Sequence, residues 1–298
     1  MKLSRLVSRP DFLPSFCAWE KLHGARVAIT GHRGVLGSLL TQRLQENQIQ
    51  VSVFNGDISD AGDITQWIRQ TQPDVVFHLA AMVPLKKVEA DPFAAMRVNA
   101  TALASIQEAI ARFAPKSWMF FASTSHVYSA TTCLRGSCHP LSEASPTEPI
   151  SLYGATKLAG ERIVIPLARY SGTQLCVGRI FSYFHERQSS AFLIPGLIAR
   201  IEDACEESVI EVRDADSVRD FLYADMVIDA MLYLCVRRAA MIVNIGSGCA
   251  TSVGAVAERL RELSAKNISF RHLPAANPNG LVADTRTLRN IISTGLDK

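Results

Sequence analysis

A strand, a glycine-rich turn and a helix follow one another near the start of this chain, and this succession constrains the fold more than any other feature. Residues 25–30 read as a short buried strand, and residues 35–44 carry apolar side chains at helical spacing. Gly31, Gly34 and Gly37 shape the turn between them. Such glycines let the backbone approach a pyrophosphate, which the amides and dipole of the helix N-terminus bind. The motif therefore predicts a dinucleotide-binding site.

Beyond this turn, strands and helices alternate along the first 180 residues. Short continuous apolar runs read as strands of the kind found in parallel sheets, and longer amphipathic runs read as helices. The expected strands are residues 25–30, 51–54, 74–81, 117–122 and 174–179, and the expected helices are residues 35–44, 64–71, 94–113 and 153–170. This alternation predicts an α/β fold with a Rossmann-type doubly wound parallel sheet.

After about residue 181 the rhythm loosens, which predicts a smaller second lobe. Helices are expected at residues 195–201, 224–235 and 253–263, and strands at residues 209–212 and 242–245. We therefore expect an N-terminal adapter segment (residues 1–23), an NAD(P)-binding Rossmann domain (residues 24–180) and a smaller C-terminal substrate-binding lobe (residues 181–298). Elements of the last part can interleave with the main sheet.

Composition and charge argue against two classes of partner. The 31 Lys and Arg residues nearly balance the 28 Asp and Glu residues, and the net charge of +3 falls short of the clustered basic excess that nucleic-acid binding needs. The apolar stretches are short and interrupted, whereas a membrane-spanning helix needs about 20 apolar residues. Residues 1–16 lack the apolar core of a secretory signal. We expect a cytoplasmic protein with no nucleic-acid or membrane partner.

The seven cysteines are scattered along the chain, with no C-x2-C pair and no histidine at metal-ligand spacing. This pattern predicts reduced structural thiols and no metal site. Cys133 and Cys138 form the one near pair, in a loop rich in Ser, Thr and Gly. A disulfide between them is geometrically possible but has no further support in the sequence.

Two further motifs carry chemistry. Tyr153 and Lys157 stand four residues apart, hence on one face of a helix. A neighbouring ammonium favours phenolate and lowers the pKa of a phenol, so proton transfer between Tyr153 and a carbonyl oxygen becomes feasible. Ser123, Thr124 and Ser125 end an expected strand, at the edge where open parallel sheets bind ligands. The alternative for these hydroxyls is simple capping of the strand end.

Two charged residues near the glycine turn bear on the choice of cofactor. Asp57 lies 20 residues after Gly37, where a carboxylate could bond the ribose or the adenine of a dinucleotide. The alternative is a turn aspartate in residues 55–57. Arg33, inside the glycine turn, could pair with the 2′-phosphate of NADP, and a plain solvent-exposed arginine is the alternative. Of the two residues, Arg33 is the better indicator and favours NADP over NAD.

Taken together, these residues resemble the extended short-chain dehydrogenase/reductase family, the NAD(P)-dependent epimerases, dehydratases and reductases of nucleotide sugars. The resemblance runs from about residue 24 to at least residue 284. The matching motifs are Thr30-Gly31-x-x-Gly34-x-x-Gly37, Gly56-Asp57-Ile58, His78-Leu79-Ala80-Ala81, Asn99, Ser123-Thr124-x-x-Val127-Tyr128, Tyr153-x-x-x-Lys157 and Arg219-Asp220-Phe221. Within the family, segments 31–38 and 51–63 look closest to the nucleotide-sugar 4-ketoreductases, such as GDP-fucose synthase and GDP-4-dehydro-6-deoxy-mannose reductase.

The resemblance implies a role for each matching residue. Tyr153 would be the catalytic acid or base, Lys157 would hold the nicotinamide ribose, and Thr124 would bond the sugar carbonyl. The cofactor would contact Gly31, Arg33, Gly34, Val35, Leu36, Gly37, Asp57, Ile58, Leu79, Ala80, Ala81, Asn99, Tyr153 and Lys157. The sugar nucleotide would contact Ser125, His126, Ser182 and Arg219. The family also implies a homodimer formed through helices 94–113 and 153–170.

Departures from the family pattern reduce the number of reactions that we expect this chain to catalyse. Dehydratases carry Asp and Glu directly after the catalytic Thr, but this chain has Ser125 and His126, so dehydration is not expected. The leading prediction is reduction of a 4-keto nucleotide-diphospho-sugar with NADPH, NAD being the second possible cofactor. Two alternatives stay open: a nucleotide-sugar 4-epimerase with tightly bound NAD, and a non-catalytic NAD(P)-binding regulator.

Overall fold

A six-stranded sheet forms the centre of the computed structural model, which describes residues 3–83, 85–132 and 138–294. All its neighbouring strands are parallel, in the order β11-β6-β4-β3-β1-β2. The strands are β1 (Arg26–Thr30), β2 (Gln50–Val53), β3 (Val75–His78), β4 (Trp118–Thr124), β6 (Gln174–Ile180) and β11 (Ile242–Ile245). This arrangement confirms the predicted Rossmann-type parallel sheet, whose inner strands are apolar because both faces are covered.

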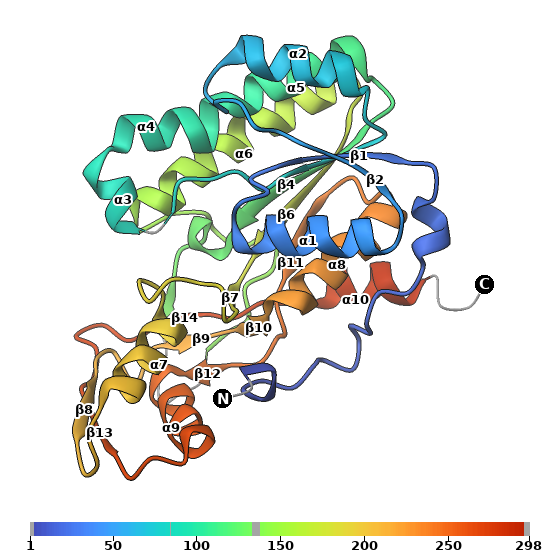
Figure 1. Cartoon of the computed structure of the whole chain (residues 1–298). Coiled ribbons are helices and arrows are strands. Elements are labelled where there is room, and N and C mark those ends of the chain that lie inside the picture. Colours follow the sequence, from blue (N-terminus) through green and yellow to red (C-terminus); the bar gives the residue numbers. More distant parts are fainter. Residues whose placement is uncertain (1–2, 84, 133–137, 295–298) are drawn as a thin grey trace.

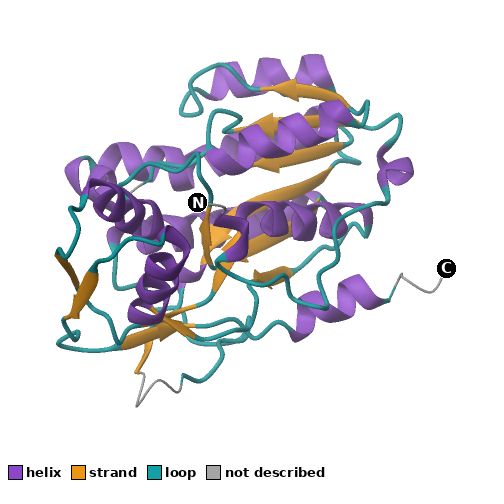
Figure 2. Cartoon of the chain, turned by 60° about the horizontal axis from the view of Figure 1, so that its bottom comes forward, coloured by secondary structure: helices purple, strands orange, loops and turns teal. Residues whose placement is uncertain are grey.

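Helices cover both faces of this sheet (Figures 1 and 2). One face is covered by α2 (Ala61–Thr71), α5 (Ala102–Phe113) and α6 (Leu152–Ser171), which share one apolar core. The other face is covered by α1 (Val35–Glu46), α8 (Ala224–Val236) and α10 (Arg286–Ser293). The helix α10 is absent from the elements expected above. Because β11 and α8 come from the later part of the chain, the two parts interleave in the main sheet.

The ends of α6 are fixed by local sequence signals. The Ser151 side chain accepts a hydrogen bond from the N–H of Gly154, which caps the start of the helix. Gly172 follows the helix in the left-handed conformation, with a φ of 74°, and ends it. The cap places Tyr153 in the first turn of α6, at the edge of the sheet where the strands end.

The expected helix over residues 94–113 is interrupted. The chain instead forms α3 (Leu85–Ala90), α4 (Pro92–Met96), a π-helical turn η3 (Arg97–Thr101) and then α5. Asp91 caps α4 by accepting from the N–H of Ala94, which agrees with proline at the first helical position. The π turn adds a residue to the helix and redirects the side chain of Asn99 into the protein, which periodicity alone does not predict.

The smaller lobe is built from short strands and two helices below the main sheet in Figure 1. Its helices α7 (Leu193–Asp203) and α9 (Val253–Ser264) enclose a separate apolar core. Its strand pairs are β7 (Ser182–Phe184) with β10 (Phe221–Tyr223), and β8 (Val209–Val212) with β13 (Ser269–His272). A four-stranded sheet has the order β12 (Thr251–Ser252), β9 (Val218–Arg219), β14 (Asn279–Leu281) and β5 (Thr131–Thr132). The lobe follows β6 directly and so faces the carboxyl ends of the strands.

Residues 3–22, here called the N-terminal strap, cross from the smaller lobe to the main sheet. Leu3 and Leu6 are buried in the apolar core of the smaller lobe. Leu13 and Phe16 are buried in the core beneath α1 and α8. The strap contains two short 3-10 turns, η1 (Leu3–Arg5) and η2 (Trp19–Leu22). One segment therefore packs into the cores of both parts of the molecule.

A buried carboxylate of α8 fastens the strap. Asp229 accepts hydrogen bonds from the Arg9 guanidinium at 2.7 Å and from the Phe16 N–H at 3.0 Å. The guanidinium of Arg43 on α1 donates to the same carboxylate at 2.7 Å. Each oxygen of the buried carboxylate is thus paired, as burial of a charge requires.

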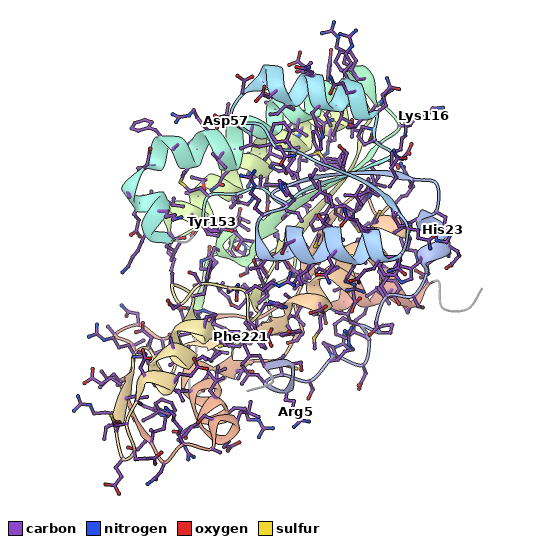
Figure 3. All side chains as sticks on the ribbon, in the orientation of Figure 1. Arg5, His23, Asp57, Lys116, Tyr153 and Phe221 are labelled. Carbon is purple, nitrogen blue, oxygen red and sulfur yellow. The ribbon has the colours of Figure 1, made fainter. Side chains whose placement is uncertain are left out.

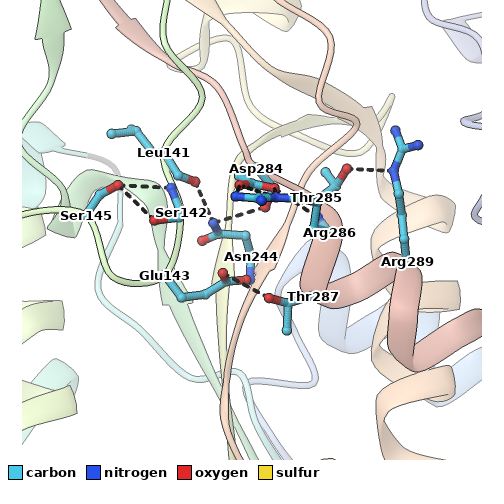
Figure 4. Close-up of polar contacts among 10 residues, drawn as sticks. All are labelled: Leu141, Ser142, Glu143, Ser145, Asn244, Asp284, Thr285, Arg286, Thr287 and Arg289. Carbon is cyan, nitrogen blue, oxygen red and sulfur yellow. Dashed lines mark hydrogen bonds and ion pairs between the residues drawn. The ribbon is translucent and has the colours of Figure 1, made fainter.

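Figure 4 shows a second polar junction, which joins β11 to the segments before α6 and before α10. The amide nitrogen of the Asn244 side chain donates to the carbonyl oxygens of Leu141 (2.7 Å) and Asp284 (3.3 Å). The carboxylate of Glu143 accepts from the backbone N–H of Asn244 and from the hydroxyl of Thr287 on α10. This junction fixes α10 against the edge strand of the sheet.

One expectation about the cysteines is wrong. Cys138 is disulfide-bonded, whereas the sequence favours reduced thiols and leaves a disulfide in this loop only as an alternative. The sequence pattern reports spacing and compartment, and neither reports whether a loop brings two thiols to bonding distance. Cys133 lies outside the described residues. The cysteines described as free thiols are Cys17, Cys176, Cys205, Cys235 and Cys249.

None of the described helices combines the length and apolar character that crossing a membrane requires. Among the residues that the structure describes, no group of three or more His, Cys, Asp and Glu side chains is placed to hold a metal ion.

Candidate active site

A cavity of about 1160 Å³ opens at the carboxyl edge of the main sheet, where it faces the smaller lobe. This is the edge at which open parallel sheets bind ligands. In Figure 3 Tyr153 lies between Asp57 and Phe221, which belong to opposite ends of the same cavity. The predicted site residues that line it are Gly31, Arg33, Gly34, Val35, Leu36, Gly37, Asp57, Ile58, Leu79, Ala80, Ala81, Thr124, Ser125, His126, Tyr153, Ser182 and Arg219. Asn99 and Lys157 lie outside the lining.

The glycine turn can exist only with glycine at two of its positions. Gly31 has a φ of +75°, and a Cβ there would lie 2.5 Å from the backbone nitrogen of Ala80. A Cβ on Gly37 would overlap the carbonyl oxygen of Gly31. The turn therefore lets the backbones of β1, α1 and the end of β3 lie in direct contact. It leaves the N-terminus of α1 facing the cavity. These residues fit a dinucleotide, because backbone amides and a helix dipole bind phosphate.

The two charged residues of the cofactor end are both exposed. Arg33 forms no ion pair with any described residue, so its guanidinium is available to a ligand. Asp57 accepts a hydrogen bond from the N–H of Ser59 at 2.8 Å, which is the turn contact considered as its alternative role. The Asp57 carboxylate nevertheless lines the cavity, so the turn contact and a ligand contact are compatible.

Tyr153 and Thr124 meet at the centre of the cavity. Their side chains are hydrogen-bonded, which lowers the pKa of Tyr153. Burial has the larger effect and, together with the nearby phenol of Tyr183, raises the pKa of Tyr153 above its usual value. The phenol is therefore held protonated in the absence of ligand. A protonated phenol beside a second hydroxyl can donate a proton to a carbonyl oxygen.

Lys157 lies deeper than the sequence predicts. Its ammonium group sits over the ring of Phe121, 4.2 Å from the ring centroid, and the side chain is fully buried. Burial lowers the pKa of Lys157 to about 7, against the opposing effect of the Glu161 carboxylate. Spacing places two residues on one helix face, but packing against Phe121 sets the direction of the ammonium.

The side chain of Asn99 links the loop after β3 to the helix that carries Tyr153. Its side-chain oxygen accepts from the N–H of Met82 at 2.7 Å, and its nitrogen donates to the hydroxyl of Thr156 at 3.0 Å. Thr156 in turn donates to the carbonyl oxygen of Tyr153 at 2.9 Å. Because the π turn aims Asn99 inward, this chain of bonds ties the loop after β3 to the first turn of α6.

A buried ion pair joins α6 to the main sheet. Arg179 on β6 donates to both carboxylate oxygens of Glu161, at 3.0 and 2.7 Å. Ser123 donates to the same carboxylate at 2.5 Å. Both charged side chains are buried, and the pair braces α6 against β4 and β6. We did not predict it from the sequence, although a charge inside an apolar strand and a carboxylate four residues after Lys157 are its signals.

Arg219, a predicted substrate contact, lies in the cavity lining. Arg219 is half-buried, and its guanidinium donates to the carbonyl oxygens of Val218 and Asn279. The neighbouring Asp220 is buried and accepts from the N–H and hydroxyl of Ser247, among other donors. The two carbonyl oxygens thus hold the guanidinium of Arg219, and the hydrogen bonds of Asp220 hold the adjacent backbone. A cation in this position can bind a phosphate group.

His126 packs edge-to-face against Tyr153, with ring centroids 5.9 Å apart. Burial, with a smaller effect of the Arg219 charge, lowers the pKa of His126 to about 4. The imidazole is therefore neutral at physiological pH. The other predicted substrate contacts, Ser125, Ser182 and Arg219, line the same cavity.

The pKa of His126 predicts a loss of stability in mild acid. Because the pKa is about 4 in the folded state and about 6.5 in the unfolded state, the unfolded chain binds the proton first as the pH falls. The stability contribution of neutral His126 is present above pH 6.5 and is lost as the pH falls towards 4. When the pH is lowered from 7 to 5, the free energy of unfolding of the wild type should fall by about 1–2 kcal/mol more than that of His126→Gln. Urea denaturation at the two pH values measures this difference.

The matched control for this measurement is His23→Gln, which removes an exposed histidine. The buried His78 is common to all three proteins, so its titration cancels in the comparison. Equal acid sensitivity of His126→Gln and the wild type would show that His126 does not titrate between these pH values.

A parallel sheet with a glycine turn at β1 and a tyrosine–threonine pair at the carboxyl edge is the arrangement of the extended short-chain dehydrogenases, the NAD(P)-dependent oxidoreductases and epimerases. The sequence model of the NAD dependent epimerase/dehydratase family matches residues 27–246, and the chain belongs to this family. The predicted class of enzyme is thereby confirmed.

Individual relatives include both reductases and epimerases. The GDP-6-deoxy-D-mannose reductase of Pseudomonas aeruginosa is 25% identical over 207 residues, which are 68% of this chain and 67% of the relative. The structure of RMD from Pseudomonas aeruginosa with NADPH has a TM-score of 0.79 at 21% identity, covering 90% of this chain and 92% of the other. The UDP-glucose 4-epimerase of Thermus thermophilus with NAD has a TM-score of 0.77 at 21% identity, covering 89% and 92%. Both structures share the fold.

Proposed function

We propose that the protein reduces the 4-keto group of a nucleotide-diphospho-sugar and prefers NADPH. The observation that carries the proposal is Arg33, an exposed guanidinium without an ion-pair partner among the described residues, at the cofactor end of the cavity. A planar guanidinium binds a phosphate group through two parallel hydrogen bonds. The protonated state of Tyr153 also supports the proposal, because reduction of a ketone needs a proton donor.

The residues of the cavity divide this reaction between them. When bound, the cofactor supplies the hydride that reaches the carbonyl carbon. The amides at the start of α1 and the turn at Gly31 hold the pyrophosphate, and Arg33 binds the 2′-phosphate. Thr124 and Tyr153 donate hydrogen bonds to the substrate carbonyl oxygen, and Tyr153 gives its proton to that oxygen as negative charge develops. Arg219 holds the diphosphate at the other end.

The test begins with the protein as purified. We would denature it, identify any released nucleotide by chromatography, and titrate the emptied protein with NADPH and NADH. An empty protein that prefers NADPH and oxidises it with a 4-keto sugar nucleotide supports the proposal. Stoichiometric NAD retained through purification would instead favour the 4-epimerase. Binding of sugar nucleotides without NADPH oxidation would contradict the reductase.

Replacing Arg33 with alanine should weaken NADPH binding selectively. Hydrogen bonds to charged groups contribute about 1.5–3 kcal/mol, so the dissociation constant for NADPH should rise at least tenfold. The constant for NADH should change less than twofold, because NADH lacks the 2′-phosphate. Fluorescence titration measures both constants, and Arg69→Ala, an exposed arginine outside the cavity, is the matched control. Equal weakening of both cofactors would contradict the assigned contact.

We also propose the homodimer that the family resemblance implies. The helices of this expected interface, residues 94–113 and 153–170, expose apolar side chains, with Met96 41% exposed and Leu167 36% exposed. A pair of such faces from two copies would form a four-helix bundle. Light scattering on the purified protein measures the oligomeric state directly. The cytoplasmic location predicted from the sequence stays a prediction.

A further inference from the structure

Tyr183 lines the cavity beside Tyr153, although the sequence motifs do not single it out. It lies on β7, directly after Ser182, and its backbone is fixed by parallel pairing with Leu222 of β10. The next residue, Phe184, is buried in the core of the smaller lobe. The phenol of Tyr183 is half-buried and is therefore held at the substrate end of the cavity on a rigid strand.

A buried glutamine sets the direction of this phenol. The side-chain oxygen of Gln188 accepts from the N–H of His185 at 3.1 Å, so its amide nitrogen faces Tyr183. That nitrogen donates to the carbonyl oxygen of Tyr183 at 3.4 Å and is also hydrogen-bonded to the phenol. Because an amide nitrogen can only donate, the phenol oxygen accepts. The proton of the phenol is left for a different acceptor.

The phenol of Tyr183 keeps this proton at physiological pH. Burial raises the pKa of Tyr183 to about 12, against the lowering effect of its contact with Gln188. Among the described residues that line the cavity, Asp57 is the only one with a carboxylate, and it lies at the cofactor end. The substrate end thus holds a neutral donor with no carboxylate beside it to accept the proton.

We propose that Tyr183 determines substrate specificity by donating a hydrogen bond to a sugar oxygen next to the reacting carbon, with Gln188 fixing its direction. This inference rests on the proposed function as a nucleotide-sugar enzyme. The reacting carbonyl oxygen has two lone pairs, and Thr124 and Tyr153 use both of them. The phenol of Tyr183, the third donor, is therefore left to bond an oxygen substituent on the neighbouring carbon, and it favours sugars that carry one. A sugar without an oxygen at that position leaves the buried phenol unpaired.

Two variants test the inference by different chemical changes. Tyr183→Phe removes the hydroxyl and keeps the ring. Gln188→Glu replaces a donor by a carboxylate, which accepts a hydrogen bond from the phenol and turns its O–H away from the cavity. Both should weaken the same contact, although only one of them alters Tyr183. Tyr170→Phe removes a hydroxyl from an exposed ring and is the matched control.

The probes are UDP-glucose, GDP-mannose and dTDP-glucose, together with UDP, GDP and dTDP. Calorimetry on the NADP-saturated protein gives the dissociation constant of each. A net contribution of one neutral hydrogen bond corresponds to about a threefold to tenfold change. For a sugar nucleotide that the wild type binds, both variants should raise the constant by this factor. In Tyr183→Phe, the constants for the nucleoside diphosphate alone and for NADPH should not change. Gln188→Glu adds a carboxylate to the cavity lining, so in that variant the sugar nucleotide should be weakened more than the nucleoside diphosphate alone.

The outcomes separate the inference from the proposed function. Unchanged binding of the sugar nucleotide in Tyr183→Phe overturns the inference, and so does equal weakening of the sugar nucleotide and of the nucleoside diphosphate. A wild type that binds NADPH but none of the sugar nucleotides overturns the proposed function, and the inference with it. Thermal unfolding shows whether each variant is folded. If Tyr183→Phe does not fold, the result with Gln188→Glu decides the question.

Discussion

Turnover should fall by about 10² to 10⁴ when Tyr153 is replaced by phenylalanine, because general acid catalysis contributes a factor of this size. The substitution removes the phenol proton and keeps the ring that packs against His126. Thr124 alone then faces the carbonyl oxygen, and its hydroxyl is a far weaker acid. The measurement is the rate of NADPH oxidation with a saturating 4-keto sugar nucleotide.

Cofactor binding separates a catalytic role of Tyr153 from a structural one. The dissociation constant for NADPH should stay within about threefold of the wild type, since the glycine turn and Arg33 are untouched. Tyr170→Phe, on an exposed part of α6, should leave both turnover and binding unchanged. If Tyr153→Phe kept its turnover, another group would donate the proton. If the wild type showed no turnover and Tyr153→Phe left its biological activity unchanged, the regulator would be favoured.

Replacing Glu161 with alanine should lower the free energy of unfolding by about 3–5 kcal/mol. Removing one partner of a buried ion pair leaves the other charge uncompensated, and this accounts for most of such a loss. Arg179 is buried on β6 and would lose both of its bonds to the carboxylate. Ser123 would lose its acceptor as well. Urea denaturation of the protein without cofactor measures the change.

The exposed ion pair between Arg259 and Glu262 provides the matched control. Both of these side chains are about half exposed, so Glu262→Ala should lower the free energy of unfolding by less than about 1 kcal/mol. Similar effects of Glu161→Ala and Glu262→Ala would mean that water reaches Arg179 and replaces the carboxylate. The brace between α6 and β6 would then be of little consequence for stability.

Local sequence signals predict most of the main sheet. The apolar runs that became β1, β3, β4 and β6 are continuous because both faces of each strand are covered, and this makes them recognisable. The helix α10 escaped prediction because its position depends on the Glu143 contact to Thr287 and on packing against α8. The break at Arg97–Thr101 escaped because its cause is the distant partner Thr156 of Asn99, which periodicity does not show.

The sequence predicts those residues of the candidate site that stand at the end of a strand or in the first turn of a helix. Gly31, Thr124 and Tyr153 all end at the carboxyl edge of the sheet, so their meeting in one cavity follows from the topology. The direction of Lys157 was not predictable, because the ring of Phe121 and the carboxylate of Glu161 decide it. Tyr183 was missed because its importance depends on Gln188, which the loop after β7 brings back to it.

The N-terminal strap imposes an order on the assembly of the chain. Arg9 is synthesised 220 residues before Asp229, its partner on α8. Leu3 packs into the core formed by α7 and α9 of the smaller lobe, which are also synthesised much later. The contacts that fasten the strap are therefore among the least local of the molecule, and the closure of such long loops is slow. Until α8 leaves the ribosome, the strap is an undocked apolar segment of the emerging chain. Docking of the strap is a late folding event, and protease resistance of residues 3–22 should appear after the main sheet has formed.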